Sequence, residues 1–151
     1  ALCVPVKFVL LDEPVLGLDA NHREMFYSEL IQTYTDNPRT FIISTHLIEE
    51  VANLISDVIV LDEGRIMLDQ PVEDVLAKTH SVVGPQKDVD AYTKGLNVIG
   101  HDNMGTIRVN YVYGDLDDRR LPDTVQLSNF DLQKLFIFLT NQFEGSRHYE
   151  N

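Results

Sequence analysis

The 151-residue sequence is poor in cysteine, in basic residues and in long hydrophobic runs. Its single cysteine, Cys3, cannot form an internal disulfide, which fits a reducing compartment, and we expect it to be a small buried hydrophobic residue. Aspartate and glutamate (24) outnumber lysine and arginine (12), and the resulting net charge of -12 argues against a surface that neutralises a phosphate backbone. We therefore expect no nucleic acid partner. No apolar run approaches the roughly 18 residues that span a bilayer, so we expect no membrane-spanning helix.

The sequence is nevertheless apolar enough to form a hydrophobic core. A 44% apolar content over 151 residues suits one compact domain or two small ones. The first residue is Ala1, and an apolar strand pattern follows almost at once. From this we expect the chain to be a piece of a longer protein.

The most informative stretch is FVLLDEPVLGLD, residues 8–19. Its four consecutive apolar residues without alternation predict a strand buried on both faces, as in a parallel sheet. Asp12 and Glu13 follow at the strand end, which is where open α/β sheets bind their ligands. Pro14 stops the strand, so we expect this acidic pair at a sharp exit. Taken by itself, such a pair is more often a solvated turn.

Two further strands and two helices follow this stretch. A helical spacing of apolar residues ends at Asn37-Pro38, and residues 40–44 (TFIIS) form a short β-branched run. Apolar residues recur at helical spacing over residues 47–55, which gives a second helical stripe. Residues 58–61 form the third apolar strand run, after 8–11 and 40–44. The members of the first stripe are Met25, Phe26, Leu30, Ile31 and Tyr34. This β-α-β-α-β order predicts the α/β class, with half of a doubly wound parallel sheet.

The third run ends in a second acidic pair, Asp62 and Glu63, which must be distinguished from the first. Gly64 and Arg65 follow it and lead into another apolar segment, a pattern typical of a tight turn between antiparallel strands. We interpret this second pair as turn residues.

Two more polar residues are candidates for a site. His46 follows the strand 40–44, and if that strand is parallel to the first, His46 and Glu13 lie at the same sheet edge. The alternative for a lone histidine is an ordinary loop or helix-start residue. Asp19 or Asn21 is a candidate helix cap, which is the simpler role for Asp19. The remaining histidines, His22, His80, His101 and His148, lack the spacing of a metal site.

Together these residues resemble the C-terminal half of an ATP-binding cassette (ABC) ATPase subunit. The later segment ending DLQKLFIFLT resembles the closing helix of C-terminal extensions on ATPase subunits of bacterial exporters, which implies the bacterial exporter type. FVLLDE resembles the Walker B strand, PVLGLD the D-loop, STH the switch-histidine motif, and DVIVLDEGRIMLD the strand pair after the switch. The resemblance covers residues 1–75. Val15 departs from the common pattern, and we expect it to be tolerated. The 151 residues contain no GxxxxGK[ST] phosphate loop, no glutamine loop and no LSGGQ-like signature.

The resemblance implies a P-loop NTPase type of sheet and a set of residue roles. Asp12 would hold Mg²⁺, through water, and Glu13 would act as general base on the attacking water. His46 would hydrogen-bond the γ-phosphate of ATP, and Asp19 would act across a head-to-tail dimer with a second ATPase subunit. The implied partner is a transmembrane permease, which would hold the protein peripherally on the cytoplasmic face of the cell membrane. Because the phosphate loop supplies most triphosphate affinity, the chain alone should be inactive.

A different organisation begins after residue 70. We predict a short helix at residues 71–76, a break at Gly84-Pro85 and a strand at 81–83. A helix at 87–94 then precedes a strand pair, 97–100 and 106–113, around Gly105. Ser128 to Asp131 resemble a capping box that starts a last helix, whose apolar face holds Leu132, Leu135, Phe136 and Leu139.

We therefore predict three parts: residues 1–79 as the ATPase part, residues 80–143 as a small α+β accessory or regulatory domain, and residues 144–151 as a flexible tail. In the accessory part we interpret Arg119 and Arg120 as solvated surface. The face with Val109, Tyr111 and Tyr113 we interpret as core or interface. Two other functions fit the sequence: an ABC-type ATPase without a transporter, and a non-catalytic interaction module.

Overall fold

The computed structural model describes residues 6–147, with side chains over residues 6–140. The chain divides into two compact units, residues 1–54 and residues 55–151. The predictions for Cys3 and His148 lie outside the described residues, as does the end of the predicted tail, residues 148–151. No helix within the described range has the length and apolar character needed to cross a membrane.

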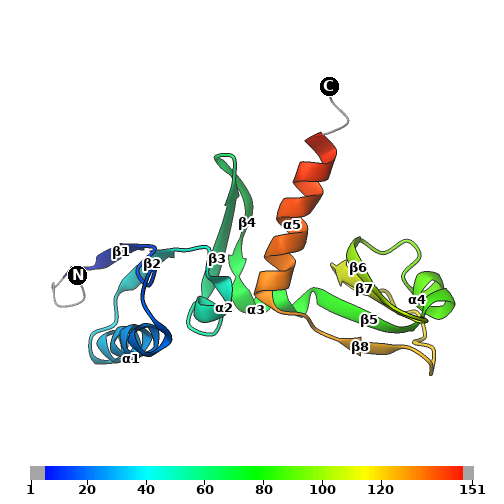
Figure 1. Ribbon diagram of the computed structural model, residues 1–151, viewed down its shortest axis with the longest axis horizontal. Helices are drawn as coiled ribbons and strands as arrows, with labels where there is room; N and C mark the ends of the chain where they lie inside the picture. Colours follow the sequence, from blue (N-terminus) through cyan, green and yellow to red (C-terminus); the bar gives the residue numbers. More distant parts are fainter. Residues whose placement is uncertain (1–5, 148–151) are drawn as a thin grey trace. The chain divides into compact units, whose positions relative to one another are not determined.

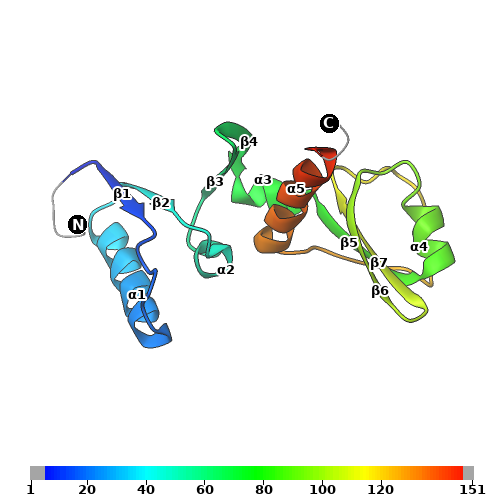
Figure 2. The same ribbon diagram turned by 45° about the horizontal axis from the view of Figure 1, so that its top comes forward.

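The first unit is a parallel strand pair joined by a helix. Its elements are β1 (Phe8–Asp12), α1 (Ala20–Asp36), β2 (Thr40–Ser44) and the short α2 (Ile48–Val51). β1 and β2 pair in parallel, from Phe8 opposite Thr40 to Asp12 opposite Ser44. Both views show α1 along one side of this pair (Figure 1, Figure 2). The predicted β-α-β crossover is therefore confirmed.

The core of this unit lies between one sheet face and α1. Val9, Leu11 and Leu30 are buried there, with Phe26 packed against them. The opposite sheet face is apolar yet exposed: Phe8 is 63% exposed, Leu10 74% and Ile42 51%. Because successive strand residues point to opposite faces, one helix buries only every second residue. The prediction of a first strand buried on both faces is therefore wrong for the described residues.

The predicted helical stripes are only partly used for packing. On α1, Leu30 is buried, whereas Met25, Ile31 and Tyr34 are exposed. The second stripe forms a single turn, α2, instead of a helix over residues 47–55. The N-H of Leu54 donates to the carbonyl of Val51 at 2.8 Å, and this i to i-3 bond closes a tight turn where the helix would continue.

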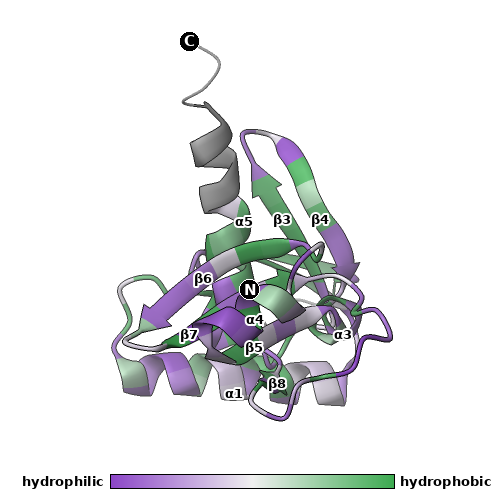
Figure 3. Cartoon of the chain, turned by 90° about the vertical axis from the view of Figure 1, so that its right-hand side faces the viewer, coloured by the Kyte–Doolittle hydropathy of each residue, from purple (hydrophilic) through white to green (hydrophobic). Residues whose placement is uncertain are grey.

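The second unit begins with an antiparallel hairpin, β3 (Asp57–Asp62) and β4 (Arg65–Pro71). Its turn contains Glu63 at φ 46° and Gly64 at φ 75°, so Glu63 is a turn residue as predicted, while Asp62 is the last residue of β3 before the turn. β3 is largely hydrophobic (Figure 3). It pairs with β4 in a two-stranded antiparallel sheet, and a third parallel strand beside β1 and β2 stays a prediction.

A four-stranded antiparallel sheet forms the centre of the second unit, in the order β6-β7-β5-β8. The second unit also contains three helices. Two of them, α3 and α4, lie close to the helices predicted at residues 71–76 and 87–94. The predicted strand pair around Gly105 is confirmed by the antiparallel pairing of β6 with β7. The elements are α3 (Val72–Ala77), β5 (Thr79–Pro85), α4 (Gln86–Tyr92), β6 (Val98–Met104), β7 (Ile107–Tyr113), β8 (Gln126–Ser128) and α5 (Leu132–Arg147).

Helices pack on both faces of this sheet. On one face Val89 and Tyr92 of α4 join Val82 and Val112 of the strands in a buried cluster. Tyr111 points to the other face, where its ring contacts Phe138 of α5 at 4.8 Å between centroids. Tyr111 is 6% exposed, so the predicted apolar face of β7 is core.

Two local predictions in this unit are wrong. Ser128 does not cap the last helix, because it pairs with Ser81 as the final residue of β8. The cap is Asp131, whose Oδ1 accepts from the N-H of Lys134 at 2.7 Å. Arg119 is not solvated surface: it is half-buried and donates to the carbonyl of Lys94 at 2.9 Å and to that of Tyr92.

Candidate active site

Glu13 leaves β1 in a conformation that residues other than glycine rarely adopt. Its φ is 41°, in the left-handed region, and its N-H donates to the carbonyl of Ser44 at 2.8 Å. Its own carbonyl accepts from Leu16 N-H at 3.1 Å, so a turn begins directly after the strand. These bonds hold the backbone of Glu13 against the end of β2, in a geometry that costs energy and recurs at functional sites.

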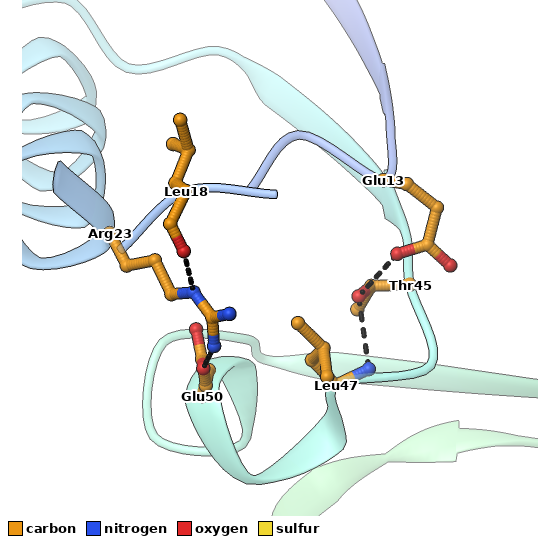
Figure 4. A network of polar contacts seen from close by, with 6 residues as sticks. All are labelled: Glu13, Leu18, Arg23, Thr45, Leu47 and Glu50. Atoms are coloured by element: carbon orange, nitrogen blue, oxygen red, sulfur yellow. Dashed lines mark hydrogen bonds and ion pairs between the residues drawn. The ribbon is translucent and has the colours of Figure 1, made fainter. Parts of the chain in front are cut away.

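The side chain of Glu13 is held by the two residues that follow β2. Its Oε1 lies 2.7 Å from Nδ1 of His46 and accepts from the His46 N-H at 3.1 Å. Its Oε2 accepts from the Thr45 hydroxyl at 3.1 Å (Figure 4). Because β1 and β2 are parallel, their carboxyl ends meet at one sheet edge. The prediction that Glu13 and His46 share this edge is confirmed.

These contacts keep Glu13 ionised. The hydrogen bond from His46 lowers the pKa of the Glu13 carboxyl below its ordinary value, and the Thr45 hydroxyl lowers it further, while desolvation opposes both. The glutamate side chain is 29% exposed and that of His46 is 62% exposed. An ionised carboxylate beside an accessible imidazole can accept a proton from water or hold a ligand.

Asp12 is placed at the same edge but with a different environment. It is the last residue of β1, opposite Ser44, and it is exposed. No group of three or more histidine, cysteine or acidic side chains in the described part of the chain could hold a metal ion.

Asp19 is the N-cap of α1, as predicted for it or Asn21. Its Oδ1 accepts from the N-H of His22 at 3.0 Å and lies 2.8 Å from the His22 ring nitrogen Nδ1. The hydrogen bonds from the His22 N-H and its ring lower the pKa of the Asp19 carboxyl. Within the described residues, no hydrogen bond or ion pair joins Asp19 to Glu13 or His46.

The loop between Glu13 and Asp19 is anchored by Val15. Its side chain is completely buried, and its carbonyl accepts from Leu18 N-H at 3.1 Å. Gly17 lies within the turn at φ 81°, a conformation that favours glycine. An apolar residue at position 15 is therefore well accommodated by the surrounding packing.

Four residues around the site were missed by the sequence analysis. Thr45 holds Glu13, and its place in the quoted STH motif was a usable signal. The N-H of His22 donates to the capping Asp19, and the position of His22 three residues after this aspartate was a weaker signal. Arg23 pairs with Glu50 across 27 residues, a long-range contact without any local signal.

No family model matches the chain. It is 33% identical over 81 residues to the energy-coupling factor transporter ATP-binding protein EcfA2 of Acetivibrio thermocellus, covering 54% of this chain and 29% of that protein. It is 32% identical over 125 residues to the molybdenum import ATP-binding protein ModC 1 of Azotobacter vinelandii, covering 82% of this chain and 34% of that protein. It is also 38% identical over 74 residues to the spermidine/putrescine import ATP-binding protein PotA of Mycoplasma genitalium, covering 48% of this chain and 13% of that protein.

The chain is thus similar to ATP-binding proteins of transporters. It spans about a third of the length of the first two of these relatives, or less. The match to the molybdenum import protein covers 125 residues and so extends into the second unit. The names of two of these relatives specify import, and none specifies export.

Proposed function

We propose that the chain is part of the ATP-binding subunit of an ABC transporter, which in its complete form hydrolyses Mg-ATP to drive transport across a membrane. The observation that supports this best is the carboxylate of Glu13, held by Thr45 and His46 at the meeting ends of two parallel strands. The chain as a whole is similar to transporter ATP-binding proteins. The fold proposed for the complete ATPase part is of the P-loop NTPase type.

Glu13 is the proposed general base. Its carboxylate is ionised at neutral pH and can accept a proton from the attacking water. Oε1 binds the N-H and the ring of His46, whereas Oε2 binds only the Thr45 hydroxyl and retains a lone pair for water. Asp12 is the proposed Mg²⁺ residue, acting through water. The metal supplies charge neutralisation on the phosphates when it is bound.

The contact with Glu13 also defines what His46 can donate. Because Oε1 of an ionised Glu13 is an acceptor, the proton of the neutral ring belongs on Nδ1. Nε2 is then an acceptor unless the ring is protonated. Donation from Nε2 to a γ-phosphate therefore requires a proton on both ring nitrogens.

The proposed partners are a transmembrane permease and a second ATPase subunit in a head-to-tail dimer, with Asp19 acting across that dimer. The protein would lie on the cytoplasmic face of the cell membrane through the permease. Import is favoured over the exporter type expected from the sequence, because the names of two relatives specify import. We retain residues 1–79 as the ATPase part, 80–143 as the accessory domain and 144–151 as the tail.

The proposal also concerns the parts that these 151 residues lack. They contain no phosphate loop, and the chain spans about a third of its first relatives. We propose that the phosphate cradle belongs to a segment of the complete protein outside these residues. The isolated chain would then be inactive.

The test begins with the DNA that precedes the codon of Ala1, which should encode a phosphate loop and a signature motif. The protein encoded by the complete gene is then purified, and ATP hydrolysis is measured with Mg²⁺ and with excess chelator. Mg²⁺-dependent hydrolysis is expected. A complete protein that releases no phosphate from ATP would overturn the proposed function.

A further inference from the structure

Arg23 joins two segments that flank the candidate site. It lies in the first turn of α1, and its Nε donates to the carbonyl of Leu18 at 2.8 Å. Its Nη1 forms an ion pair with Oε1 of Glu50 in α2 (Figure 4). One guanidinium therefore binds the loop that precedes α1 and the helix that follows His46. The planar fork of arginine can make both bonds at once.

This ion pair is better protected from solvent than a typical surface pair. The side chain of Arg23 is 32% exposed and that of Glu50 is 27% exposed. The second oxygen of Glu50 is buried. Burial raises the pKa of the nearby Tyr27 hydroxyl, and the charge of Glu50 raises it further. Glu50 therefore depends on Arg23 for charge compensation.

From Glu50 the connection continues to Glu13. The short helix α2 begins after Leu47, whose N-H donates to the Thr45 hydroxyl oxygen at 3.1 Å. The same hydroxyl donates its proton to Oε2 of Glu13, also at 3.1 Å. Thr45 thus uses both its acceptor and its donor, and this fixes its orientation. Figure 4 shows the two ends of this network in one view.

We propose that Arg23 is a positioning residue for the reaction, and this inference rests on the proposed ATPase function. Arg23 holds the loop with Asp19 in register with the turn that carries Thr45 and His46. It acts through Glu50 and α2, and none of its described contacts is to Glu13 or His46. Loss of the ion pair would let α2 and its preceding turn shift relative to the loop. Thr45 and His46 would then hold the Glu13 carboxylate less well.

The kinetic consequence differs from that of a residue that binds the nucleotide. Small misplacements of a general base lower turnover by large factors, while affinity for the triphosphate depends on a separate cradle. Removing the Arg23 guanidinium should therefore lower kcat and leave the KM for ATP nearly unchanged. A residue that only stabilises the fold would lower the amount of active protein without this split.

The experiment uses the complete protein and the variants Arg23→Gln, Glu50→Gln and the double variant, with Arg120→Gln as a matched control. Arg120 is an exposed arginine outside this network. Each single variant should lower kcat about ten- to a hundredfold with KM for ATP within about twofold, because the base is misplaced. The double variant should be no slower than the slower single variant, since both remove one interaction.

A second readout is amide hydrogen exchange in the complete protein. The Leu47 N-H, which binds Thr45, should exchange several times faster in Arg23→Gln, while the amide of the core residue Leu30 should be unchanged. If Arg23→Gln does not fold, Glu50→Gln serves in both measurements, because glutamine retains the size of glutamate.

The outcomes separate this inference from the proposed function. If the unmodified complete protein hydrolyses no ATP, the proposed function fails and the inference fails with it. If it hydrolyses ATP and Arg23→Gln matches Arg120→Gln in kcat, the inference alone is overturned. Strictly additive losses in the double variant, or unchanged exchange at Leu47, would also contradict it.

Discussion

The carboxylate of Glu13 lies 2.7 Å from the imidazole of His46, although 33 residues separate them in the chain. The parallel pairing of β1 and β2 is what brings them together, because it aligns Asp12 with Ser44 at the last position of both strands. The left-handed φ of 41° at Glu13 then turns its side chain toward the residues after β2. Their contact is therefore a product of strand pairing and of one unusual backbone conformation.

The first prediction concerns Glu13→Gln in the complete protein. The substitution removes the base but retains the size and most hydrogen bonds, so ATP binding should persist while kcat falls by roughly 10²- to 10⁴-fold. Steady-state phosphate release and equilibrium nucleotide binding check this. Glu63→Gln is the matched control, because Glu63 follows the same Leu-Asp pair but lies in the hairpin turn. Near-normal turnover by Glu13→Gln would contradict the assignment of the base.

The second prediction concerns the 151-residue chain by itself. It contains no phosphate loop, so it lacks the backbone donors and the lysine that bind a triphosphate. Calorimetric titration with Mg-ATP should show a Kd weaker than about 1 mM, equivalent to a binding free energy weaker than about -4 kcal/mol. Phosphate release should not exceed that of buffer. Binding in the micromolar range would show that these residues form a nucleotide site without the loop.

The third prediction concerns the close contact of Gly100 with α5. A Cβ at this position would clash with the ring of Phe138, which is packed against Tyr111 and Phe130. Gly100→Ala should therefore destabilise the second unit by about 1–3 kcal/mol, as overpacking does elsewhere. Denaturant unfolding measures this, with Asn103→Ala on the same strand as control. The added substitution Phe138→Leu should recover part of the loss; an additive double variant would argue against this contact.

The fourth prediction concerns acid stability of the second unit. Tyr111 donates to Oδ2 of Asp102 at 2.8 Å and Lys134 does so at 3.2 Å, and these bonds lower the pKa of the Asp102 carboxyl below 3.8. A lowered carboxyl pKa stabilises the fold above pH 3.8, and this stabilisation is lost as the pH falls through the folded pKa.

Asp102→Asn should therefore cost up to about 1 kcal/mol near neutral pH, since the pair is partly exposed, and less as the pH falls below about 4. Unfolding free energies at several pH values test this, with the exposed Asp115→Asn as control. A cost that does not change between neutral and acid pH would show that the ionised form of Asp102 is not what stabilises the unit.

Local interactions explain which predictions from the sequence were confirmed. The Asp19 cap, the turn at Glu63 and Gly64, and the strand pair around Gly105 each depend on a few neighbouring residues. Their backbone preferences and hydrogen bonds act within one turn, so residue type and spacing suffice to predict them. The shared edge of Glu13 and His46 was also predictable, because parallel strands joined by a helix must align their carboxyl ends.

Long-range contacts decided what the sequence left open. The residue types predict an apolar β1. Only one face of this strand is buried, because a single helix covers it. Ser128 has the right residue type for a cap, yet its pairing with Ser81 places it in β8, and Asp131 takes the capping role. The ion pair of Arg23 with Glu50 joins residues 27 apart and has no local signature. The sequence by itself determined the hairpin turns, the Asp19 cap and the candidate acids. Tertiary structure decided which faces are buried and which side chains hold Glu13, because only packing brings distant residues together.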